Sequence, residues 1–566
     1  MSSSRVRPQV VSARPVAAVG LAVVAWSLLL AVVTFGRWPA LSWSVGATCL
    51  GTVYQAVNAV PTVLFDVAAG SSLAAMGVPM LVGALGHGRP RDVPRLGSAV
   101  LSWTVVVLGV GSVAVAVAAQ PLAGVLVGES GCAGAVGVAT EMLRWFAPQP
   151  VLLGAGVVLG GILRAHGRPL AASLGPALAS LVAVGSLVWF GLLASASDGT
   201  GVSEAHLAVL AGGTTLATLV LVVVPAVVCG RAEVGLRPTF RVPLALAAGN
   251  RGVAPACALA LLGQLFAAVT AVVVTSRSGV GVLPVHAYVQ GTLLLPYAAL
   301  LLPLVARVLS RLTGVTSTPE PRPEDPEATT VVTRSARHRK APRVGLLAWR
   351  ARAAVALAAL GASSVAAAAE PVGGFFGDID AAQESTQGRA ALDALPAGLW
   401  ASAAALVPLG LAAVLCAALY VRGRPFMAGG AVAAGWLIAG AAALAAVMPG
   451  ATPAWTLVVL GLATVVGMTV ATLDLLAATS RAWGPGALAG LGRTVVVSLL
   501  GGAVGAAAGV LVGRWWTVDG AWTNLGVAVV LAVLGGLVTV SAVATLNRDL
   551  ARWLWGRVRP PGPTPE

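Results

Sequence analysis

Long apolar runs follow one another along almost the whole chain, and short polar turns separate them. Each run has about 20 residues or more, the length that an α-helix needs to cross a hydrocarbon core of about 30 Å. The runs are continuous rather than alternating and about twice as long as a barrel strand, which argues against membrane strands. The pattern therefore predicts an all-α polytopic membrane protein with about 14 transmembrane helices.

The positions of these runs predict where the helices lie. The stretch 39–66 continues as a second apolar run over 68–86, which fits either one bent helix or a span followed by a re-entrant piece. The expected helices are 16–35, 39–66, 98–124, 142–163, 170–195, 206–229, 242–275, 282–306, 351–369, 397–421, 427–449, 453–479, 494–513 and 523–546.

Composition supports a membrane protein. The chain of 566 residues is 58% hydrophobic and only 10% charged, with a mean hydropathy of +0.90, whereas a soluble domain carries about 25% charged residues. Alanine, glycine and valine dominate the helices and Lys340 is the single lysine, which we attribute to codon bias in a high-GC bacterium. The net charge of +15 does not indicate a nucleic-acid partner, because the arginines lie at helix ends.

The arginines also predict the topology. With the N-terminus inside, 30 of the 35 lysine and arginine residues fall on the inner side. This asymmetry predicts a multi-pass protein of the inner, cytoplasmic membrane with both termini in the cytoplasm and an even number of spans. The first apolar run lacks a small-residue cleavage site, so we expect it to be retained as a helix. The five cationic residues expected outside are Arg37, Arg144, Arg277, Arg389 and Arg514.

The stretch 313–345 is the only sizeable polar insert, and its proline, threonine and mixed charge predict a flexible cytoplasmic linker. The linker divides the chain into two lobes. The five cysteines are too far apart to signal a disulfide framework or a metal cluster, and we expect no cofactor. The expected parts are an N-terminal lobe of eight helices (1–312), the basic linker (313–350), a C-terminal lobe (351–479), helices 13 and 14 (480–546) and a cytoplasmic tail (547–566).

Few polar side chains lie inside the expected spans, and each is a candidate for function because burying it in lipid is costly. Gln55 and Asn58 are three residues apart and share a helix face, which fits a cavity lining or plain interhelical hydrogen bonding equally well. Asp66 and His286 are titratable, so either can couple transport to an ion, although an interfacial position explains both as well. The candidates for the cavity are Arg37, Gln55, Asn58, Gln264, Arg277 and Gln290.

Enzyme motifs such as HExxH, GxSxG and the P-loop are absent from the sequence, and we expect no catalytic residues. The acidic residues Asp378, Asp380 and Glu384 match a cation site of a membrane glycosyltransferase, but a solvated outer loop over 370–395 explains them better.

Four segments resemble the MurJ (MviN) family of lipid II flippases, which belongs to the MOP superfamily. The first, VGATCLGTVYQAVNAVPTVLFDVAAGSSLAAMGVPML, has a Gly-Ala turn, an apolar helix ending in proline and a closing VP. The others are a proline-containing helix with a following arginine turn, an aromatic-plus-LP helix and a Y-x-R…P turn, at 142–176, 287–309 and 419–429. The ordered set is similar to a divergent, actinobacterial-type member.

This resemblance implies two pseudo-symmetric lobes around a central cavity, with two C-terminal helices that form a groove for a lipid tail. It implies that the cargo is lipid II, the polyprenyl-pyrophosphate-linked peptidoglycan precursor, moved by alternating access. Membrane lipids and cell-wall synthesis proteins are the other expected partners. Arginine suits the pyrophosphate because its planar fork binds phosphate through two hydrogen bonds.

The sequence departs from the family where the cavity should be most cationic. Arg37 matches a family arginine, but the acidic residue expected next is Trp38. An arginine pair after the proline of helix two falls on Phe65 and Asp66, and the arginine of helix eight falls on Gly291. Two alternatives therefore stay open: an ion-coupled exporter of another lipid-linked glycan or drug with the same fold, and a non-transporting cell-wall scaffold.

Overall fold

The computed structural model describes residues 26, 29–65, 92–128, 131–166, 168–193, 202–232, 235–240, 252–305, 328–380, 386–516 and 519–550. Every regular element in these ranges is a helix, so the predicted all-α class is confirmed. Eleven helices are long and apolar enough to cross a membrane, or up to 12 if the bent pair Gly388–Ala403 and Leu406–Val421 forms one span. The predicted count of 14 is not confirmed.

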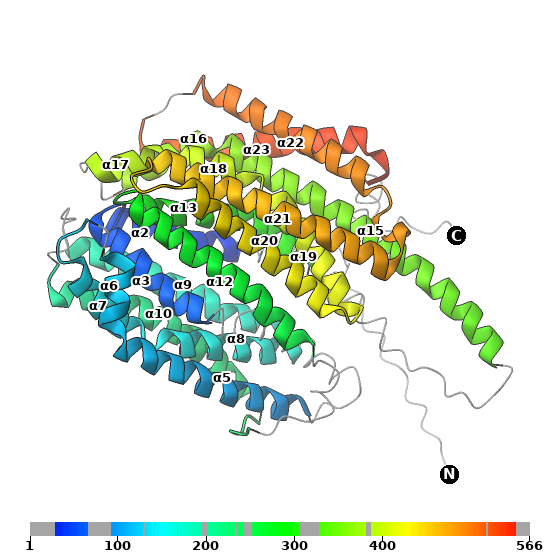
Figure 1. The fold of residues 1–566 in the computed structure, drawn as a ribbon, viewed down its shortest axis with the longest axis horizontal. Helices are drawn as coiled ribbons and strands as arrows, with labels where there is room; N and C mark the ends of the chain where they lie inside the picture. The colour runs from blue at the N-terminus through cyan, green and yellow to red at the C-terminus, as the bar shows by residue number, and fades with distance from the viewer. Residues whose placement is uncertain are drawn as a thin grey trace, which may run out of the picture.

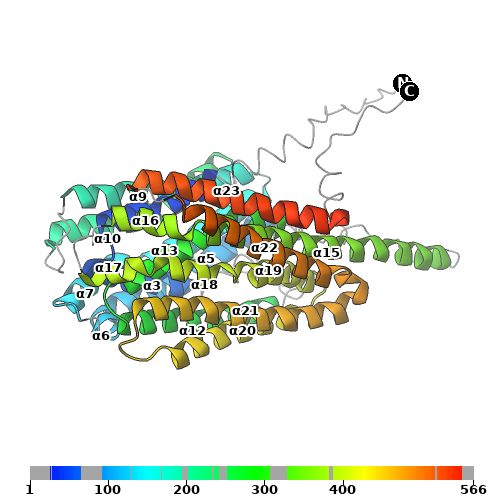
Figure 2. The same cartoon turned by 90° about the horizontal axis from the view of Figure 1, so that it is seen from above.

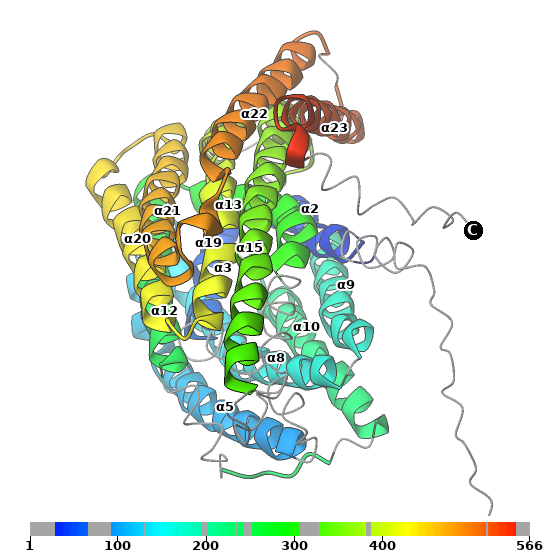
Figure 3. The same ribbon diagram turned by 90° about the vertical axis from the view of Figure 1, so that its right-hand side faces the viewer.

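The helices form two bundles that lie side by side (Figures 1 and 3). The first bundle, blue to cyan, contains eight helices among the described residues. They are α2 (Arg37–Ser44), α3 (Cys49–Phe65), α5 (Asp92–Val117), α6 (Ala119–Val127), α7 (Ala135–Phe146), α8 (Gln149–Ala165), α9 (Pro169–Leu193) and α10 (Glu204–Arg231).

The second bundle, green to orange, carries a terminal pair of helices on the side away from the first bundle (Figures 1 and 3), and Figure 2 looks down on this pair from above. The terminal pair is α22 (Leu491–Gly513) and α23 (Ala521–Leu546), which pack on each other and on α15. The second bundle consists of α12 (Val253–Arg277), α13 (Val282–Pro296), η2 (Tyr297–Leu301), α15 (Ala328–Ala367), α16 (Ala369–Ile379), α17 (Thr386–Asp393), α18 (Leu395–Ala403), α19 (Leu406–Val421), α20 (Pro425–Ala446), α21 (Pro453–Trp483) and η3 (Pro485–Leu488).

Most predicted helices are present within a few residues, and the structure differs from the expected bounds in three places. The run 39–66 is neither one helix nor a bent one, because a turn at Val45–Thr48, with Gly46 at φ +66°, separates α2 from α3. The expected linker 313–350 is helical from Ala328 onward, where α15 begins. The division at residue 312 does not follow the packing, since α12 packs most extensively on α20 of the second bundle. The run 68–86 and most of 16–35 lie outside the described residues.

Glycines at helix contacts let the backbones come close. A Cβ atom added to Gly467 of α21 would lie 2.2 Å from the carbonyl oxygen of Gly435 in α20, and one added to Gly429 would lie 2.1 Å from that of Ala256. In the terminal pair, a Cβ on Gly505 would lie 2.4 Å from the Gly535 carbonyl oxygen. Membrane helices associate through such small-residue contacts, because lipid offers no hydrophobic drive to pack. The abundance of glycine therefore has a structural use beyond codon bias.

These contacts yield a prediction with a matched control. Replacing Gly467 by alanine should destabilise the protein by about 1–3 kcal/mol, because the added methyl group overpacks the α20–α21 contact. Gly185, in the middle of α9, has no atom within 4 Å of its added Cβ, so Gly185→Ala should leave stability unchanged or raise it slightly. Thermal unfolding in detergent, followed by tryptophan fluorescence, measures both variants. Equal melting temperatures for the two variants would contradict this account.

Candidate functional site

A buried carboxylate joins the two bundles. Asp380 follows α16, is only 3% exposed, and accepts a hydrogen bond from the Ser42 hydroxyl at 2.5 Å and from the Ala47 amide at 2.8 Å. Both donors belong to the first bundle. The Tyr288 hydroxyl of α13 donates to the same carboxylate at 3.4 Å, and its ring stacks on Phe376 with ring centroids 4.8 Å apart. The carboxylate thus fixes α2 and the turn before α3 against the second bundle.

The start of α13 also packs closely against the turn between α2 and α3 and the first turn of α3. The Gly281 amide donates to the Thr52 hydroxyl at 3.0 Å, and Gly281 adopts φ +84° with the Ala47 carbonyl oxygen 2.6 Å from where its Cβ would be. A Cβ on Gly51 would lie 3.4 Å from the Pro284 ring. Only glycine permits both the backbone conformation and the close approach at position 281. We call this region, built from residues 42–52, 281–288 and 376–380, the junction.

A disulfide lies beside the junction. Cys49, the first residue of α3, bonds to Cys132 before α7, with Cα atoms 5.8 Å apart. The expectation that the sequence carries no disulfide is therefore wrong. The 83 residues between the two cysteines conceal the pairing in the sequence, because the topology alone brings their Cα atoms together.

Below the junction, three polar atoms of the first bundle are buried without a hydrogen-bond partner among the described residues: Arg37 Nε, the Tyr54 hydroxyl and Gln55 Nε2. Tyr54 is fully buried, packs edge-on against Phe146 at 5.9 Å, and its hydroxyl lies beside the Arg37 and Thr214 side chains. The Thr214 hydroxyl donates to the Ala211 carbonyl. Buried polar groups without partners are rare in native proteins, which indicates that a ligand or water satisfies them here.

Gln55 and Asn58 continue the face of α3 that meets the second bundle. Gly51 and Thr52 make the junction contacts, and Gln55 lies one helical turn further along on the same side, with Asn58 a turn beyond it. Gln55 is 7% exposed and Asn58 is half-buried. The two side chains therefore lie on the side of α3 that carries the junction contacts, and their role in a cavity stays a prediction.

On α13, His286 and Gln290 are four residues apart and share a face. His286 is half-buried and Gln290 is exposed, whereas Tyr288 and Val289 on the other side are buried. The face of Gln290 and His286 is thus left open while the opposite side packs on α16 and α18.

Gly291 is the closest contact between α13 and the first bundle below the junction. A Cβ added there would lie 2.2 Å from Nε1 of Trp38, so the indole ring lies directly against the glycine. The Arg37 guanidinium carbon lies 5.6 Å from the same ring. Trp38 and Gly291, two of the departures from the family pattern, are therefore complementary: the tryptophan occupies the space that a side chain at position 291 would need.

The remaining predicted site residues are more scattered. Gln264 is exposed on α12, beside the glycine that packs on α20. Arg277 ends α12, is exposed, and accepts the Gly450 amide through its carbonyl at 3.4 Å. Arg37 is the first residue of α2, two helical turns before the 45–48 turn. Asp66 lies outside the described residues.

Sequence reasoning missed Asp380, Ser42, Tyr54 and Tyr288. The interpretation of 370–395 as a solvated acidic loop is wrong, because α16 and α17 occupy most of it and two of its aspartates have separate partners. Asp378 accepts the Asn524 amide of α23 at 2.9 Å, while Asp380 bonds the first bundle. The apolar run around Phe375 and Phe376 was the available sign that this loop is packed rather than solvated.

Two helical bundles joined at one end form the fold of a two-lobe helical membrane protein, and the comparisons with solved structures agree with this fold. The fold is similar to a lipid II flippase MurJ in an inward closed conformation, at a TM-score of 0.65 and 11% identity over 94% of this chain and 100% of that one. It is also similar to an inward-facing multidrug resistance MATE family transporter of the MOP superfamily, at a TM-score of 0.52 and 17% identity over 84% of this chain and 99% of that one. A Vibrio cholerae MATE transporter matches at a TM-score of 0.55 and 14% identity, over 82% of this chain and 97% of that one.

Residues 41–320 match the family model of the lipid II flippase MurJ, and by this match the chain belongs to the MurJ family. No curated protein sequence matches the chain. The predicted family and MOP-type fold are confirmed.

If the Asp380 carboxylate holds the two bundles together at the junction, weakening its hydrogen bonds should open the junction. Replacing Asp380 by asparagine should speed hydrogen–deuterium exchange of peptides covering 42–52 and 279–288, since a neutral amide holds its donors less strongly than a carboxylate. Asp378→Asn is the matched control, because Asp378 is an exposed aspartate two residues away that accepts a hydrogen bond from Asn524 of α23. Unchanged exchange in Asp380→Asn, or equal acceleration in both variants, would show that the carboxylate does not hold the bundles together.

The Trp38–Gly291 contact predicts a dependence between two positions. Gly291→Arg should lower stability by several kcal/mol, because the new side chain collides with the indole ring. Trp38→Ala combined with Gly291→Arg should recover much of the loss. A double-mutant cycle on thermal unfolding measures the coupling, and purely additive effects would refute the proposed complementarity.

Proposed function

We propose that this protein moves a polyprenyl-pyrophosphate-linked peptidoglycan precursor, lipid II, across the cytoplasmic membrane by alternating access. The observation that carries the proposal is the set of unsatisfied buried groups of Arg37, Tyr54 and Gln55 beneath a sealed junction, in a chain whose family is that of lipid II flippases. An anionic headgroup with many hydroxyl groups supplies the acceptors and donors that these side chains lack.

In this proposal Arg37 binds the pyrophosphate. Its guanidinium is the cationic group at the lobe interface, and the adjacent indole of Trp38 restricts its rotation. Gln55, Asn58 and Gln290 contribute neutral hydrogen bonds to the sugar and peptide, with Gln264 and Arg277 along α12. The polyprenyl chain stays in the lipid while the headgroup crosses, so the protein need not bury the tail.

Alternating access follows from how the bundles are joined. The contacts between them gather on α2, α3 and α6 of the first and on α12, α13 and α16 of the second. By the arginine topology this end faces outward, and the disulfide Cys49–Cys132 at the same end fits an oxidising compartment. Release of the headgroup to the outside then requires the bonds to Asp380 to break and the opposite ends of the bundles to approach.

One further candidate has an observation in its favour. Several MATE transporters share the fold, and the open, half-buried face of His286 offers a titratable group between the bundles. An ion-coupled exporter of another lipid-linked glycan or drug would use His286 or Asp66 for coupling. Loss of transport in His286→Gln, with Arg37→Ala silent, would favour this candidate over the flippase.

The flippase proposal predicts the outcome of complementation. We expect the chain, expressed in a bacterium depleted of its own lipid II flippase, to restore externally accessible lipid II. Arg37→Ala should reduce that pool by about tenfold or more, because charge-assisted hydrogen bonds to the pyrophosphate are lost. Arg389→Ala is the control, since Arg389 pairs with Asp393 on the surface at 3.3 Å. Full rescue by Arg37→Ala, at equal membrane abundance, would rule out the role given to Arg37.

A further inference from the structure

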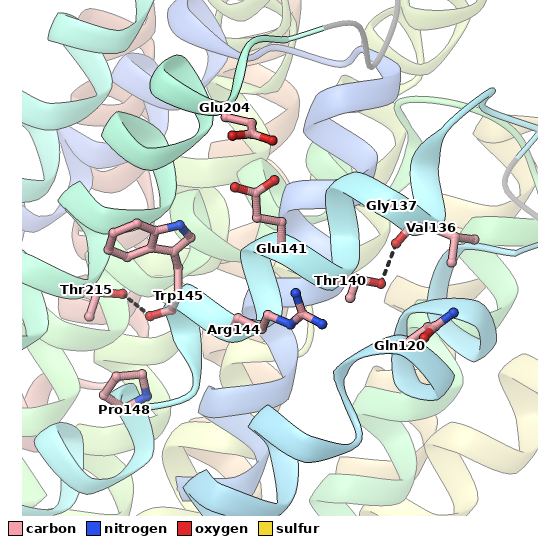
Figure 4. Close-up of a pocket in the computed structure, with 10 residues that line it drawn as sticks. All are labelled: Gln120, Val136, Gly137, Thr140, Glu141, Arg144, Trp145, Pro148, Glu204 and Thr215. Atoms are coloured by element: carbon pink, nitrogen blue, oxygen red, sulfur yellow. Dashed lines mark hydrogen bonds between the residues drawn. The ribbon is translucent and has the colours of Figure 1, made fainter.

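A second polar pocket lies away from the junction, on the first bundle. It has a volume of about 870 Å³ and is formed by α6, α7 and the start of α10 (Figure 4). Its lining contains charged and aromatic side chains that the flippase mechanism does not use. The lining residues are Gln120, Val136, Gly137, Thr140, Glu141, Arg144, Trp145, Pro148, Glu204 and Thr215.

The pocket lies on the side of α7 that faces away from the core of the bundle. Ala139, Met142 and Phe146 are buried, and this face packs toward α3. Arg144 and Trp145 are exposed and point the other way, with the Trp145 ring 42% exposed. The Thr215 hydroxyl of α10 donates to the Trp145 carbonyl at 2.9 Å, which fixes α10 as one wall of the pocket (Figure 4).

The length of the span places this pocket at the outer membrane interface. The span Ala135–Arg164 has 30 residues, about 45 Å of helix at 1.5 Å per residue, and exceeds the hydrocarbon core by about 15 Å. The charge of Arg164 places it at the inner interface. A helix needs about 20 residues to cross the hydrocarbon core, so the outer boundary of the core lies near Arg144 and Trp145. Arginine and an exposed tryptophan are typical of that depth. The first ten residues of α7 then project into the headgroup layer.

The charges in the pocket lie in the order Glu204, Glu141, Arg144. Glu204 is the first residue of α10, and Arg144 lies three residues further along α7 than Glu141, toward the end of the span that carries Arg164. Figure 4 shows the Glu141 carboxylate turned toward Glu204 and the Arg144 guanidinium on the far side of Glu141. The side chains of Glu204, Glu141 and Arg144 form no ion pair or hydrogen bond with the described residues. This holds although Glu141 and Arg144 are three residues apart on α7. A cation between the two carboxylates would be attracted to both of them, and an anion would be attracted to the unpaired guanidinium.

We infer that this pocket binds the headgroup of a zwitterionic phospholipid with a primary ammonium, from the outer leaflet. In such a lipid the phosphate lies at the hydrocarbon boundary and the ammonium lies further out, joined by a two-carbon link. The phosphate therefore meets Arg144 while the ammonium donates to Glu141 and Glu204, and an acyl chain follows Trp145 and Pro148 toward the bilayer. The site is independent of the cargo proposed above.

The charge pattern also predicts selectivity among lipids. A quaternary ammonium cannot donate a hydrogen bond to either carboxylate, so phosphatidylcholine should bind more weakly. Phosphatidylglycerol brings its phosphate to Arg144 but leaves the two carboxylates without a cation. Phosphatidylethanolamine satisfies all three groups.

Native mass spectrometry of the full chain, titrated with each of these three lipids in detergent, tests the inference. We expect phosphatidylethanolamine to bind at least about tenfold more tightly than the other two, because each charge-assisted hydrogen bond contributes on that scale. Arg144→Gln should weaken its binding by about tenfold, Glu141→Gln should abolish its advantage over phosphatidylglycerol, and Arg144→Lys should retain part of the affinity. Arg514→Gln, which removes an exposed arginine outside the pocket, should have no effect.

Two results would overturn the inference. Equal binding of the three lipids by the wild-type chain would show a nonspecific annulus. Unchanged phosphatidylethanolamine binding in both Arg144→Gln and Glu141→Gln, with melting temperatures like that of the wild type, would place the lipid elsewhere.

Discussion

The buried carboxylate of Asp380 is the interaction on which the arrangement of the two bundles depends. An ionised group at 3% exposure is unstable unless donors surround it, and here the donors come from the first bundle and from α13. The carboxylate therefore penalises separation of the bundles at this end more than apolar packing would, because separation leaves a charge without partners. Many other helix contacts are made by glycine and alanine, which pack closely but carry no such penalty.

The chemistry between the bundles is sparse by comparison. Arg37 brings the charge, and its neighbours Tyr54 and Gln55 bring neutral groups that are buried without partners. Trp38 and Gly291 fill the space that the family pattern assigns to an acidic residue and a further arginine. A headgroup would then be held by one cation and several neutral hydrogen bonds. Weaker binding would favour release of the headgroup on the far side of the membrane. A headgroup bound equally tightly in every conformation would not shift the equilibrium between the conformations.

The sequence predicts the helices well and the site only in part. Continuous apolar runs specify most spans to within a few residues, because their length is set by the bilayer. Gln55 and Asn58 could be singled out as candidates because a polar residue in an apolar helix is unusual. Asp380 was not, because it sits in a polar stretch where a buried carboxylate looks like a solvated one until Ser42 and Ala47, more than 300 residues away, are placed beside it. The Cys49–Cys132 disulfide and the membership of α12 in the second bundle likewise depend on contacts between distant segments.

The most direct test of alternating access measures both ends of the bundles at once. Spin labels on exposed positions, with Cys229, Cys257 and Cys416 replaced by alanine, would report one distance from Gly137 to Trp400 near the junction and another from His166 to Arg422 at the opposite end. On adding lipid II in nanodiscs, the account predicts that the junction distance lengthens while the opposite distance shortens. Distances that stay fixed, or that change in the same direction, would contradict it.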